Sequence, residues 1–343
     1  MKKKLKILLI ADPGIAVPPQ FYGGHERLVY LFAEEYNRLG HSVLLLAGPN
    51  STISGKVFSF GKNDLNRSKI KKLQELIYVW FFLVSKRKRF DAIHNFGRLL
   101  YLLPALKTPA KKLMTYGREV SRFGIKMTTS FQPKNLTFTA CSNYCVNTGN
   151  ISGSWKTVYN AINFSKYQLK KQVVKEAPLM FLGRLDKVKG VHTAIKVAKA
   201  IQQILWIGGN IPTTPDNLLY YKQYIEPQID GVQIIYLGEL NDHQKNEYLG
   251  KAKALLFPIE WNEPFGLVMV EAMACGTPVI GFNKGAVPEV IDEGLTGFIV
   301  NNLDEMISAA NDIQNLNRSI CRETAKTRFD VAVIAETYLQ LME

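Results

Sequence analysis

The chain has 343 residues, which is long for one domain and suits two. Its 47% of hydrophobic residues is enough for ordinary globular cores, and its four cysteines, without a metal-ligand spacing, indicate a reduced cytoplasmic protein rather than a disulfide scaffold or a zinc module. The net charge of +14 belongs to the first half, since residues 1–160 hold 25 Lys and Arg against 8 Asp and Glu.

The first half predicts an α/β domain over residues 1–160. The start, MKKKLKILLIAD, could be a signal peptide, but its apolar run meets Asp12 after about six residues, short of the usual ~7–15. We therefore interpret residues 5–12 as a strand. Gly23 and Gly24 then open a helix over residues 25–40. Further strands are predicted at residues 41–48, 92–96, 111–116 and 136–141, and the alternation of strands with helices predicts a parallel sheet.

Residues 73–90 join an apolar run with helical spacing to four consecutive cations. One interpretation is an interfacial helix, with its aromatic residues in the headgroup zone and its cations on anionic lipid. The other is a helix packed on the sheet, which the strand order requires in any case. The basic clusters of this half indicate either an anionic partner or an ordinary soluble surface. They are Lys69, Lys71 and Lys72; Lys86, Arg87, Lys88 and Arg89; and Lys111 and Lys112.

The second half repeats the α/β pattern over residues 161–330. Strands are predicted at residues 177–185, 203–209, 232–238, 254–260 and 277–282, with helical stretches between them. The polar residues 160–178 lack a strong period and are expected to link the two domains. The tail, residues 331–343, predicts a helix that packs either on the second domain or back on the first.

The segment EPFGLVMVEAMACGTPVI, residues 263–280, is the most informative part of the chain. Glu263 lies in a loop, and Glu271, eight residues later, is placed about two turns into the helix that follows. The N-terminus of this helix offers free N–H groups and the positive end of a dipole. Both carboxylates are therefore predicted to meet one phosphate-bearing ligand at this terminus.

Two further glycine-containing turns open helices. GRLDKVKG, residues 183–190, puts Arg184 and Lys189 before a helix, where two cations suit a diphosphate, although basic loops are also common. YGGHERLV, residues 22–29, is either a tight turn or a backbone that approaches a ligand phosphate or sugar. The five histidines show no metal-binding spacing. His94 ends a strand, where α/β sites open, and is equally compatible with a structural role.

These motifs together resemble a known family. EPFGLVMVEAMACGTPVI, GRLDKVKG, GAVPEVIDEGLTGFIV, GGHERLV and GHSVLLLAG occur in the order found in the retaining glycosyltransferases of family 4, which have the GT-B fold, and they span nearly the whole chain. The resemblance implies an α/β fold in which two Rossmann-like domains face each other across a cleft. It also implies a nucleotide-sugar donor and neither a cofactor nor a metal.

The resemblance assigns roles to individual residues. Arg184 and Lys189 match the basic pair that holds the donor diphosphate and stabilises the charge of the leaving group, so that no metal is needed. Glu263 matches the catalytic-site glutamate that contacts the donor sugar, and Glu271 matches the one that receives the ribose hydroxyls. The other matched positions are Gly23 and Gly24 for the diphosphate, Phe265, Gly266 and Leu267 for the donor sugar, and Gly238 to Leu240 for the base.

One position departs from the family pattern. Many members carry a histidine after the fourth strand of the first domain, near the donor sugar, whereas KKLMTYGRE has Tyr116 there, followed by Gly117 and Arg118. The role of that histidine is therefore not transferred. Tyr116, Arg118 and His94 are kept as candidates for the acceptor or donor-sugar side.

We therefore expect a metal-independent, retaining glycosyltransferase that moves a sugar to a hydroxyl acceptor. The preferred acceptor is a lipid-linked saccharide of surface-polysaccharide synthesis, and the expected location is the cytoplasm, with attachment to the inner face of the membrane left open. One alternative is a non-transferring epimerase of the same fold, for which the sequence shows no set of acid–base carboxylates and histidines. The other is a nucleic-acid binder, for which no stacking-aromatic motif accompanies the charge.

Overall fold

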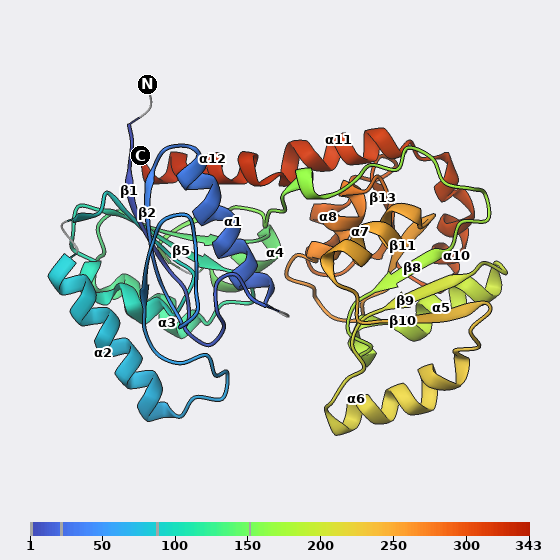
Figure 1. The fold of residues 1–343 in the computed structure, drawn as a ribbon, viewed down its shortest axis with the longest axis horizontal. Coiled ribbons are helices and arrows are strands. Elements are labelled where there is room, and N and C mark those ends of the chain that lie inside the picture. Colours follow the sequence, from blue (N-terminus) through green and yellow to red (C-terminus); the bar gives the residue numbers. More distant parts are fainter. Residues whose placement is uncertain (1–2, 21–22, 87–88, 151) are drawn as a thin grey trace. The chain divides into compact units, whose positions relative to one another are not determined.

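The computed structural model describes residues 3–20, 23–86, 89–150 and 152–343. It divides the chain into two compact units. Unit 1 is Met1–Ile162 with Val331–Glu343, and unit 2 is Asn163–Asp330. Figure 1 labels the elements of both units.

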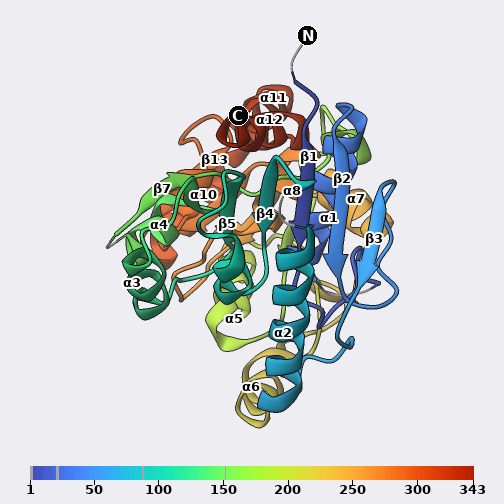
Figure 2. The same cartoon turned by 90° about the vertical axis from the view of Figure 1, so that its left-hand side faces the viewer.

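Unit 1 contains a 7-stranded parallel sheet of order β3-β2-β1-β4-β5-β6-β7. Figure 2 shows β1 to β5 of this sheet, with α2 in front of them. The elements of unit 1 are β1 Lys6–Ile10, α1 Gly24–Arg38, β2 Ser42–Ala47, β3 Lys56–Ser59, α2 Lys69–Lys86, β4 Ala92–Asn95, η2 Leu99–Ala105, β5 Lys111–Tyr116, α3 Arg122–Ser130, β6 Leu136–Ala140, α4 Asn143–Gly149, β7 Ser154–Thr157 and α12 Val331–Met342.

The residues of β1 alternate between two apolar layers. Ile7 and Leu9 pack with α1 and α12, whereas Leu8 and Ile10 pack with α2 and η2. A parallel strand covered on both faces is apolar throughout, and this is why KILLI could be recognised as a strand. The tail helix α12 belongs to the first layer through Ile334 and Tyr338, so it packs back on unit 1, the second of the two placements left open above.

Unit 2 contains a 6-stranded parallel sheet of order β10-β9-β8-β11-β12-β13. Its strands are β8 Leu179–Leu182, β9 Leu205–Gly208, β10 Ile234–Gly238, β11 Ala254–Phe257, β12 Val279–Phe282 and β13 Gly297–Val300. Its helices are η3 Phe164–Lys166, η4 Lys187–Lys189, α5 Val191–Ala200, α6 Pro215–Tyr220, η5 Tyr221–Ile225, η6 Glu226–Gln228, α7 Asp242–Lys251, α8 Leu267–Ala274, α9 Val287–Val290, α10 Leu303–Asp312, η7 Ile313–Asn315 and α11 Arg318–Phe329.

Three strands of the structure lack a counterpart in the prediction. They are β3, β7 and β13, and all three form an edge of their sheet. An edge strand is covered less completely than a central one, so it can carry more polar residues. The sequences KVFS and SWKT of β3 and β7 illustrate this, because polar residues occupy two of the four positions in β3 and three of the four in β7.

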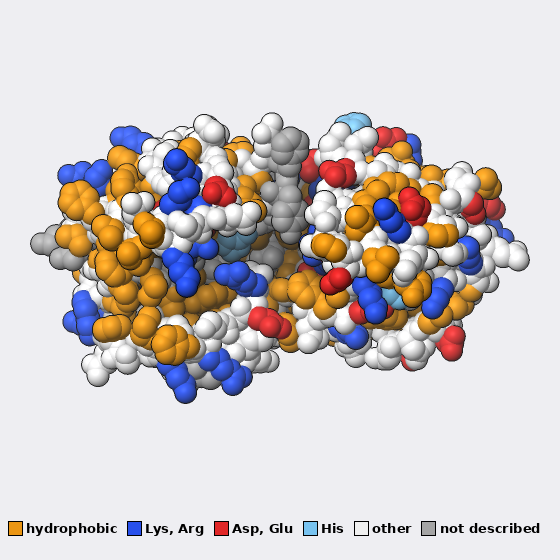
Figure 3. All heavy atoms as spheres, turned by 90° about the horizontal axis from the view of Figure 1, so that it is seen from below, with side chains coloured by type: hydrophobic (Ala, Val, Ile, Leu, Met, Phe, Trp, Pro, Cys, Tyr) orange, Lys and Arg blue, Asp and Glu red, His pale blue; other side chains and the backbone are white. Residues whose placement is uncertain are grey.

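The basic surface of unit 1 is smaller than predicted. Lys112, expected there, is fully buried, and its Nζ donates to the carbonyl oxygen of Thr108 at 2.8 Å. Burial lowers the pKa of Lys112 to about 8. Arg87 and Lys88 lie outside the described residues. Figure 3 shows Lys and Arg side chains around hydrophobic ones on the side of unit 1 that carries α2.

The thickness of a bilayer sets a minimum length for a helix that crosses it. A transmembrane helix needs about 20 predominantly apolar residues. Across the ranges that the structure describes, no helix combines the length and the hydropathy needed to cross a membrane.

Candidate active site

The strand order of unit 2 marks one position in its sheet. From β8 the chain continues outward to β9 and β10, and from β11 it continues outward to β12 and β13, so the order reverses between β8 and β11. Open α/β sheets bind ligands beyond the carboxyl ends of the strands at such a point. Arg184 follows β8 and Glu263 follows β11. Two of the predicted site residues therefore follow the two strands that flank the reversal.

Lys189 and Glu263 form the central ion pair of this site. Lys189 Nζ donates to Glu263 Oε2 at 2.7 Å. Trp261 Nε1 donates to the same oxygen at 2.9 Å, and the Trp261 ring lies 4.9 Å from Lys189 Nζ. The side chains of Lys189 and Glu263 are only 18% and 13% exposed, so water screens their attraction less than it does at the surface.

Two close backbone approaches hold this pair together. Gly190 has a φ of 74°, and a Cβ there would lie 1.9 Å from the carbonyl oxygen of Pro258, so the η4 turn can approach the loop after β11 only with glycine. On the other side, Ala286 N donates to the carbonyl oxygen of Glu263 at 2.8 Å, and a Cβ on Gly285 would meet that oxygen at 2.4 Å. The GAVPEV motif therefore supports the backbone of Glu263.

Arg184 lies on the same turn as Lys189. Its Nη2 forms an ion pair with Asp186 at 2.8 Å, while its side chain remains 55% exposed. Asp186 is buried and directly precedes η4, which ends at Lys189. The turn therefore presents two cations, one exposed and one partly buried, and each already has a carboxylate partner.

Glu271 lies closer to the start of its helix than predicted. Helix α8 begins only at Leu267, after Gly266 in the left-handed conformation with a φ of 84°, so Glu271 is about one turn inside it rather than two. Glu271 Oε1 accepts hydrogen bonds from the Tyr167 hydroxyl at 3.0 Å and from Lys245 Nζ at 3.1 Å. Among the described residues, no hydrogen bond or ion pair joins Glu271 to Glu263.

Burial and neighbouring charges shift the pKa values of Lys245 and Tyr167, the two donors to Glu271. Burial alone lowers the pKa of the Lys245 ammonium, but the charges of Glu271 and Asp242 outweigh this effect and the pKa is raised. Burial and the charge of Glu271 raise the pKa of Tyr167, so its hydroxyl remains protonated and can donate. Glu271 thus accepts hydrogen bonds from two donors in the free protein.

The remaining predicted positions of unit 2 differ in what they present. Phe265 is buried with its ring centroid 5.6 Å from that of Phe329, so its side chain is used for packing. Gly266 and Leu267 form the start of α8. Gly238 ends β10, and no atom lies within 4 Å of the position that a Cβ would take there. Leu240 follows two residues later and packs near Gly208.

The predicted residues of unit 1 lie on loops and strand ends of that unit. Gly23 precedes α1, and Gly24 is the first residue of the helix, while Tyr22 of the same motif lies outside the described residues. Tyr116 ends β5, with its ring 6.0 Å from that of Trp155, and burial raises its pKa. Arg118 is exposed two residues further on.

His94 is part of the interior of unit 1. It is fully buried, with Nε2 2.8 Å from Thr115 Oγ1 and Nδ1 3.3 Å from the Tyr36 hydroxyl. The Tyr338 ring of α12 lies 4.5 Å from the imidazole. Burial, with a smaller effect from the charge of His25, lowers the pKa of His94 well below its usual value. These contacts favour the structural role over contact with a substrate.

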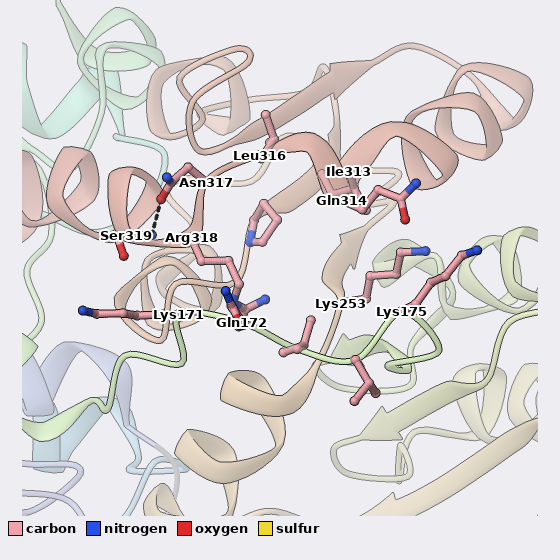
Figure 4. Close-up of a pocket in the computed structure, with 13 residues that line it drawn as sticks. Lys171, Gln172, Lys175, Lys253, Ile313, Gln314, Leu316, Asn317, Arg318 and Ser319 are labelled. Atoms are coloured by element: carbon pink, nitrogen blue, oxygen red, sulfur yellow. Dashed lines mark hydrogen bonds between the residues drawn. The ribbon is translucent and has the colours of Figure 1, made fainter.

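A separate cavity of about 560 Å³ lies in unit 2, away from these residues. It lies between the segment 171–175, Lys253 and the residues from Ile313 to Ser319 (Figure 4). The guanidinium of Arg318 on its wall donates to the carbonyl oxygens of Lys170, Gly250 and Ala252, so this arginine holds the backbone together. None of the predicted site residues lines the cavity.

Sequence reasoning missed three residues that shape the site. Trp261 could have been noticed, because it stands two positions before Glu263. Tyr167 and Lys245 carried no local signal, since they are 104 and 26 residues from Glu271 in the chain. Their contribution depends on the folding of unit 2.

The sequence of unit 2 is similar to the sequences of known proteins. Residues 165–325 match the family model described as glycosyl transferases group 1. An uncharacterized protein of the Klebsiella pneumoniae cps region is 29% identical over 201 residues, 54% of either chain. The phosphatidyl-myo-inositol mannosyltransferase of Propionibacterium freudenreichii is 32% identical over 146 residues, 40% of this chain and 36% of that one. The alignments thus cover about half, or less, of these curated relatives.

A solved structure extends the comparison to the whole fold. Anabaena HepE in complex with UDP-glucose has a TM-score of 0.72 to this chain at 18% identity, and the match covers 98% of both chains. This confirms the predicted fold class of two Rossmann-like α/β domains. Residues 165–325 are thus similar to the glycosyl transferases group 1, and the solved structure shares the fold of the whole chain.

Proposed function

We propose that the chain is a retaining, metal-independent glycosyltransferase of family 4, which transfers a sugar from a nucleotide-diphosphate donor to a hydroxyl acceptor. The observation that carries the proposal is the Lys189–Glu263 pair at 2.7 Å, beside Arg184, at the point where the strand order of unit 2 reverses. Cations at this position suit the donor diphosphate, and a carboxylate beside them suits the hydroxyls of the donor sugar.

The chemistry follows from these positions. Arg184 and Lys189 bind the diphosphate and stabilise the negative charge that grows on it as the bond from the anomeric carbon to the phosphate oxygen breaks. The acceptor oxygen forms its bond to that carbon from the same face, and its proton moves to the departing phosphate oxygen. The anomeric configuration is therefore retained, and no side chain has to act as a general base. Trp261 keeps a hydrogen bond to Glu263 while Lys189 turns to the phosphate.

The other predicted residues complete the donor site. The Glu271 carboxylate accepts hydrogen bonds from the ribose hydroxyls in addition to those from Tyr167 and Lys245. The backbone of Gly266 and Leu267 contacts the sugar, and the segment Gly238 to Leu240 holds the base. From unit 1, Gly23 and Gly24 are assigned to the diphosphate, and Tyr116 and Arg118 to the acceptor or donor-sugar side.

For the acceptor we propose a lipid-linked saccharide of surface-polysaccharide synthesis, used in the cytoplasm at the inner face of the membrane. The relative from a cps region and the relative named for a phosphatidylinositol substrate support this choice. The excess of basic residues in the first half is also consistent with an anionic lipid surface. The epimerase alternative is not favoured, since one relative is named as a mannosyltransferase and the matched family model describes glycosyl transferases.

A panel of UDP-, GDP- and ADP-sugars tests the proposal. The donor that the protein uses should raise its unfolding temperature, since a ligand at 100 times its Kd adds about 2.7 kcal/mol of stability. With that donor, Glu263→Ala and Lys189→Ala should abolish most of the turnover, in the presence or absence of EDTA, and NMR should show an unchanged anomeric configuration in the product. Wild-type turnover by both variants would refute the site, and an inverted product would refute retention.

A further inference from the structure

Helix α2 of unit 1 has two apolar faces. Its buried face consists of Glu75, Val79, Phe82 and Leu83. The α2 stripe, defined as Ile70, Leu73, Ile77, Phe81 and Val84, is exposed, with between 55% and 75% of each residue accessible to solvent. At about 100° per residue, the centre of the stripe lies about 180° from the centre of the buried face. The outer face of a surface helix is normally polar, so the α2 stripe needs another explanation.

The orientation of α2 is fixed by buried contacts. Glu75 forms ion pairs of 2.8 Å with both Arg67 and Arg98. Arg98 Nη1 also donates to the carbonyl oxygen of Lys72 at 3.0 Å, and Trp80 Nε1 donates to that of Leu100 at 2.8 Å. A rotation that buried the α2 stripe would break these ion pairs and expose Val79 and its neighbours instead. The α2 stripe therefore faces solvent because the ion pairs and hydrogen bonds of Glu75, Lys72 and Trp80 hold α2 in this rotation.

Positive charge surrounds the α2 stripe. Lys69, Lys71 and Lys72 are exposed near the N-terminus of α2, whose first turn has no acidic residue. The positive end of the helix dipole lies at the same place, so the charge there is uncompensated within the helix. Arg89 is exposed just beyond the C-terminus. Figure 3 shows hydrophobic side chains gathered on this side of unit 1 and basic side chains among and around them.

We propose that the α2 stripe docks unit 1 on an anionic bilayer surface. The stripe would enter the boundary between headgroups and acyl chains, and the lysines near the N-terminus of α2 would contact the lipid phosphates. An apolar face that lies in the plane of the interface, bordered by cations, is what such binding requires. Both interpretations of this segment then apply, one to each face of the helix. The α2 stripe is interfacial, and the opposite face packs on the sheet.

Charge argues against a second copy of the chain as the partner of the α2 stripe. A parallel pairing of two α2 helices would place the N-terminal lysines against one another. An antiparallel pairing would place them against Lys86 and Arg89. The acidic residue of α2, Glu75, is buried in its own ion pairs and offers no compensation. An anionic lipid surface supplies the missing charge in either orientation of the helix.

If the proposed function holds, docking through α2 also places the site that receives the acceptor near the membrane. The strand order of unit 1 reverses between β1 and β4, so ligands of this unit are expected beyond the ends of those strands. Asp12 follows β1 and Arg98 follows β4, and the two form an ion pair at 3.2 Å. Since Arg98 also binds Glu75 of α2, the docked helix is directly connected to the place where a lipid-linked acceptor would be received.

Vesicle sedimentation of the full chain, without donor or acceptor, tests the docking independently of catalysis. The probes are vesicles of phosphatidylglycerol with phosphatidylcholine, and vesicles of phosphatidylcholine alone. The first variant is Ile77→Glu with Phe81→Glu. Its matched control is Leu219→Glu with Val232→Glu, two residues of unit 2 with exposed fractions of 56% and 76%, close to the 55% and 75% of Ile77 and Phe81. The second variant is Lys71→Glu with Lys72→Glu, and its control is Lys171→Glu with Lys175→Glu on unit 2. Thermal unfolding verifies that each variant is folded.

The wild type should bind the anionic vesicles, and binding should weaken in ~1 M salt, where the Debye length is ~3 Å. The partition coefficient of the stripe variant onto the anionic vesicles should be at least about tenfold lower than that of the wild type. The partition coefficient of the lysine variant should fall by about fivefold for each lysine replaced. The unit 2 controls should bind the vesicles as the wild type does. Absence of wild-type binding at low salt, or a folded stripe variant that binds normally, would overturn the proposal. So would a wild-type dimer in sedimentation velocity that the stripe variant converts to a monomer. Loss of turnover in the Lys189 variant with normal vesicle binding would separate the two proposals.

Discussion

The Lys189–Glu263 pair is predicted to matter more for turnover than for stability. Lys189→Met keeps most of the volume of the side chain and removes its charge. In the free protein, Glu263 would still accept the hydrogen bond that Trp261 Nε1 donates at 2.9 Å in the wild type. The Glu263 carboxylate would therefore keep one donor. With the donor substrate bound, the same change removes one of the two cations assigned to the diphosphate.

The structure sets the size of both effects. With side chains that are 18% and 13% exposed, the pair lies between a surface ion pair, of about 0–1 kcal/mol, and a buried one, whose disruption costs about 3–5 kcal/mol. We expect Lys189→Met to lower the free energy of unfolding by about 1–2 kcal/mol. Loss of a group that stabilises charge in the transition state costs about 10²–10³ in kcat. Most of a protein with ~5–15 kcal/mol of stability would remain folded, so unfolding could not explain this loss.

A double-mutant cycle of Lys189→Met and Glu263→Gln is the assay, with urea unfolding and steady-state kinetics on all four proteins. The double variant should lose less stability than the two single variants together, because it leaves neither charge unpaired. Its turnover should be no better than that of the weaker single variant. A folded Lys189→Met protein within about threefold of wild-type kcat would refute the assignment, since ~10²-fold is expected. Recovery of turnover together with stability in the double variant would show that the pair is structural only.

Three further outcomes are expected. Trp261→Phe keeps a ring near Lys189 but removes the hydrogen bond to Glu263, so kcat/KM should fall by about fivefold, and an unchanged value would show that Trp261 does not position the carboxylate. Tyr167→Phe removes a donor from Glu271 and should raise the nucleotide Kd by about fivefold with kcat unchanged, as measured by titration. Lys112→Met should stabilise unit 1 at pH 7, because the buried ammonium is costly. Since the folded pKa of Lys112 is about 8 and the unfolded one ~10.4, unfolding takes up a proton between these values. Wild-type stability should therefore rise through that window relative to Lys112→Met, and a difference in unfolding midpoint that stays constant from pH 7 to pH 10 would contradict this.

Central strands could be predicted from the sequence, because each depends on nearby residues. The run SVLLLA of β2 is apolar along its length, as a strand buried on both faces should be. The edge strands β3 and β7 could not be predicted in this way, because polar residues occupy half or more of their positions. The start of α8 was misplaced because the left-handed Gly266 delays the helix until Leu267, a backbone property that the spacing of two glutamates does not report.

Contacts between distant segments account for the rest of what the sequence could not predict. For His94 the sequence left a site at an open strand end and a structural role equally compatible, and the ring of Tyr338, from the opposite end of the chain, packs on it. The rotation of α2 was open because an apolar run is compatible with either face inward, and the ion pairs of Glu75 with Arg67 and Arg98 decide it. Such contacts have no periodicity, so only the folded chain reveals them.

The candidate site of unit 2 is electrostatically balanced before any ligand binds. Arg184 is paired with Asp186 at 2.8 Å, and Lys189 with Glu263 at 2.7 Å, so neither cation is without a carboxylate. In the proposed reaction, a donor diphosphate must share these cations, and its binding therefore exchanges ion pairs instead of adding new ones. The net gain in the ground state is then small. As the leaving group takes up charge in the transition state, its oxygens compete more strongly for the same cations, so the interaction grows where it increases the rate.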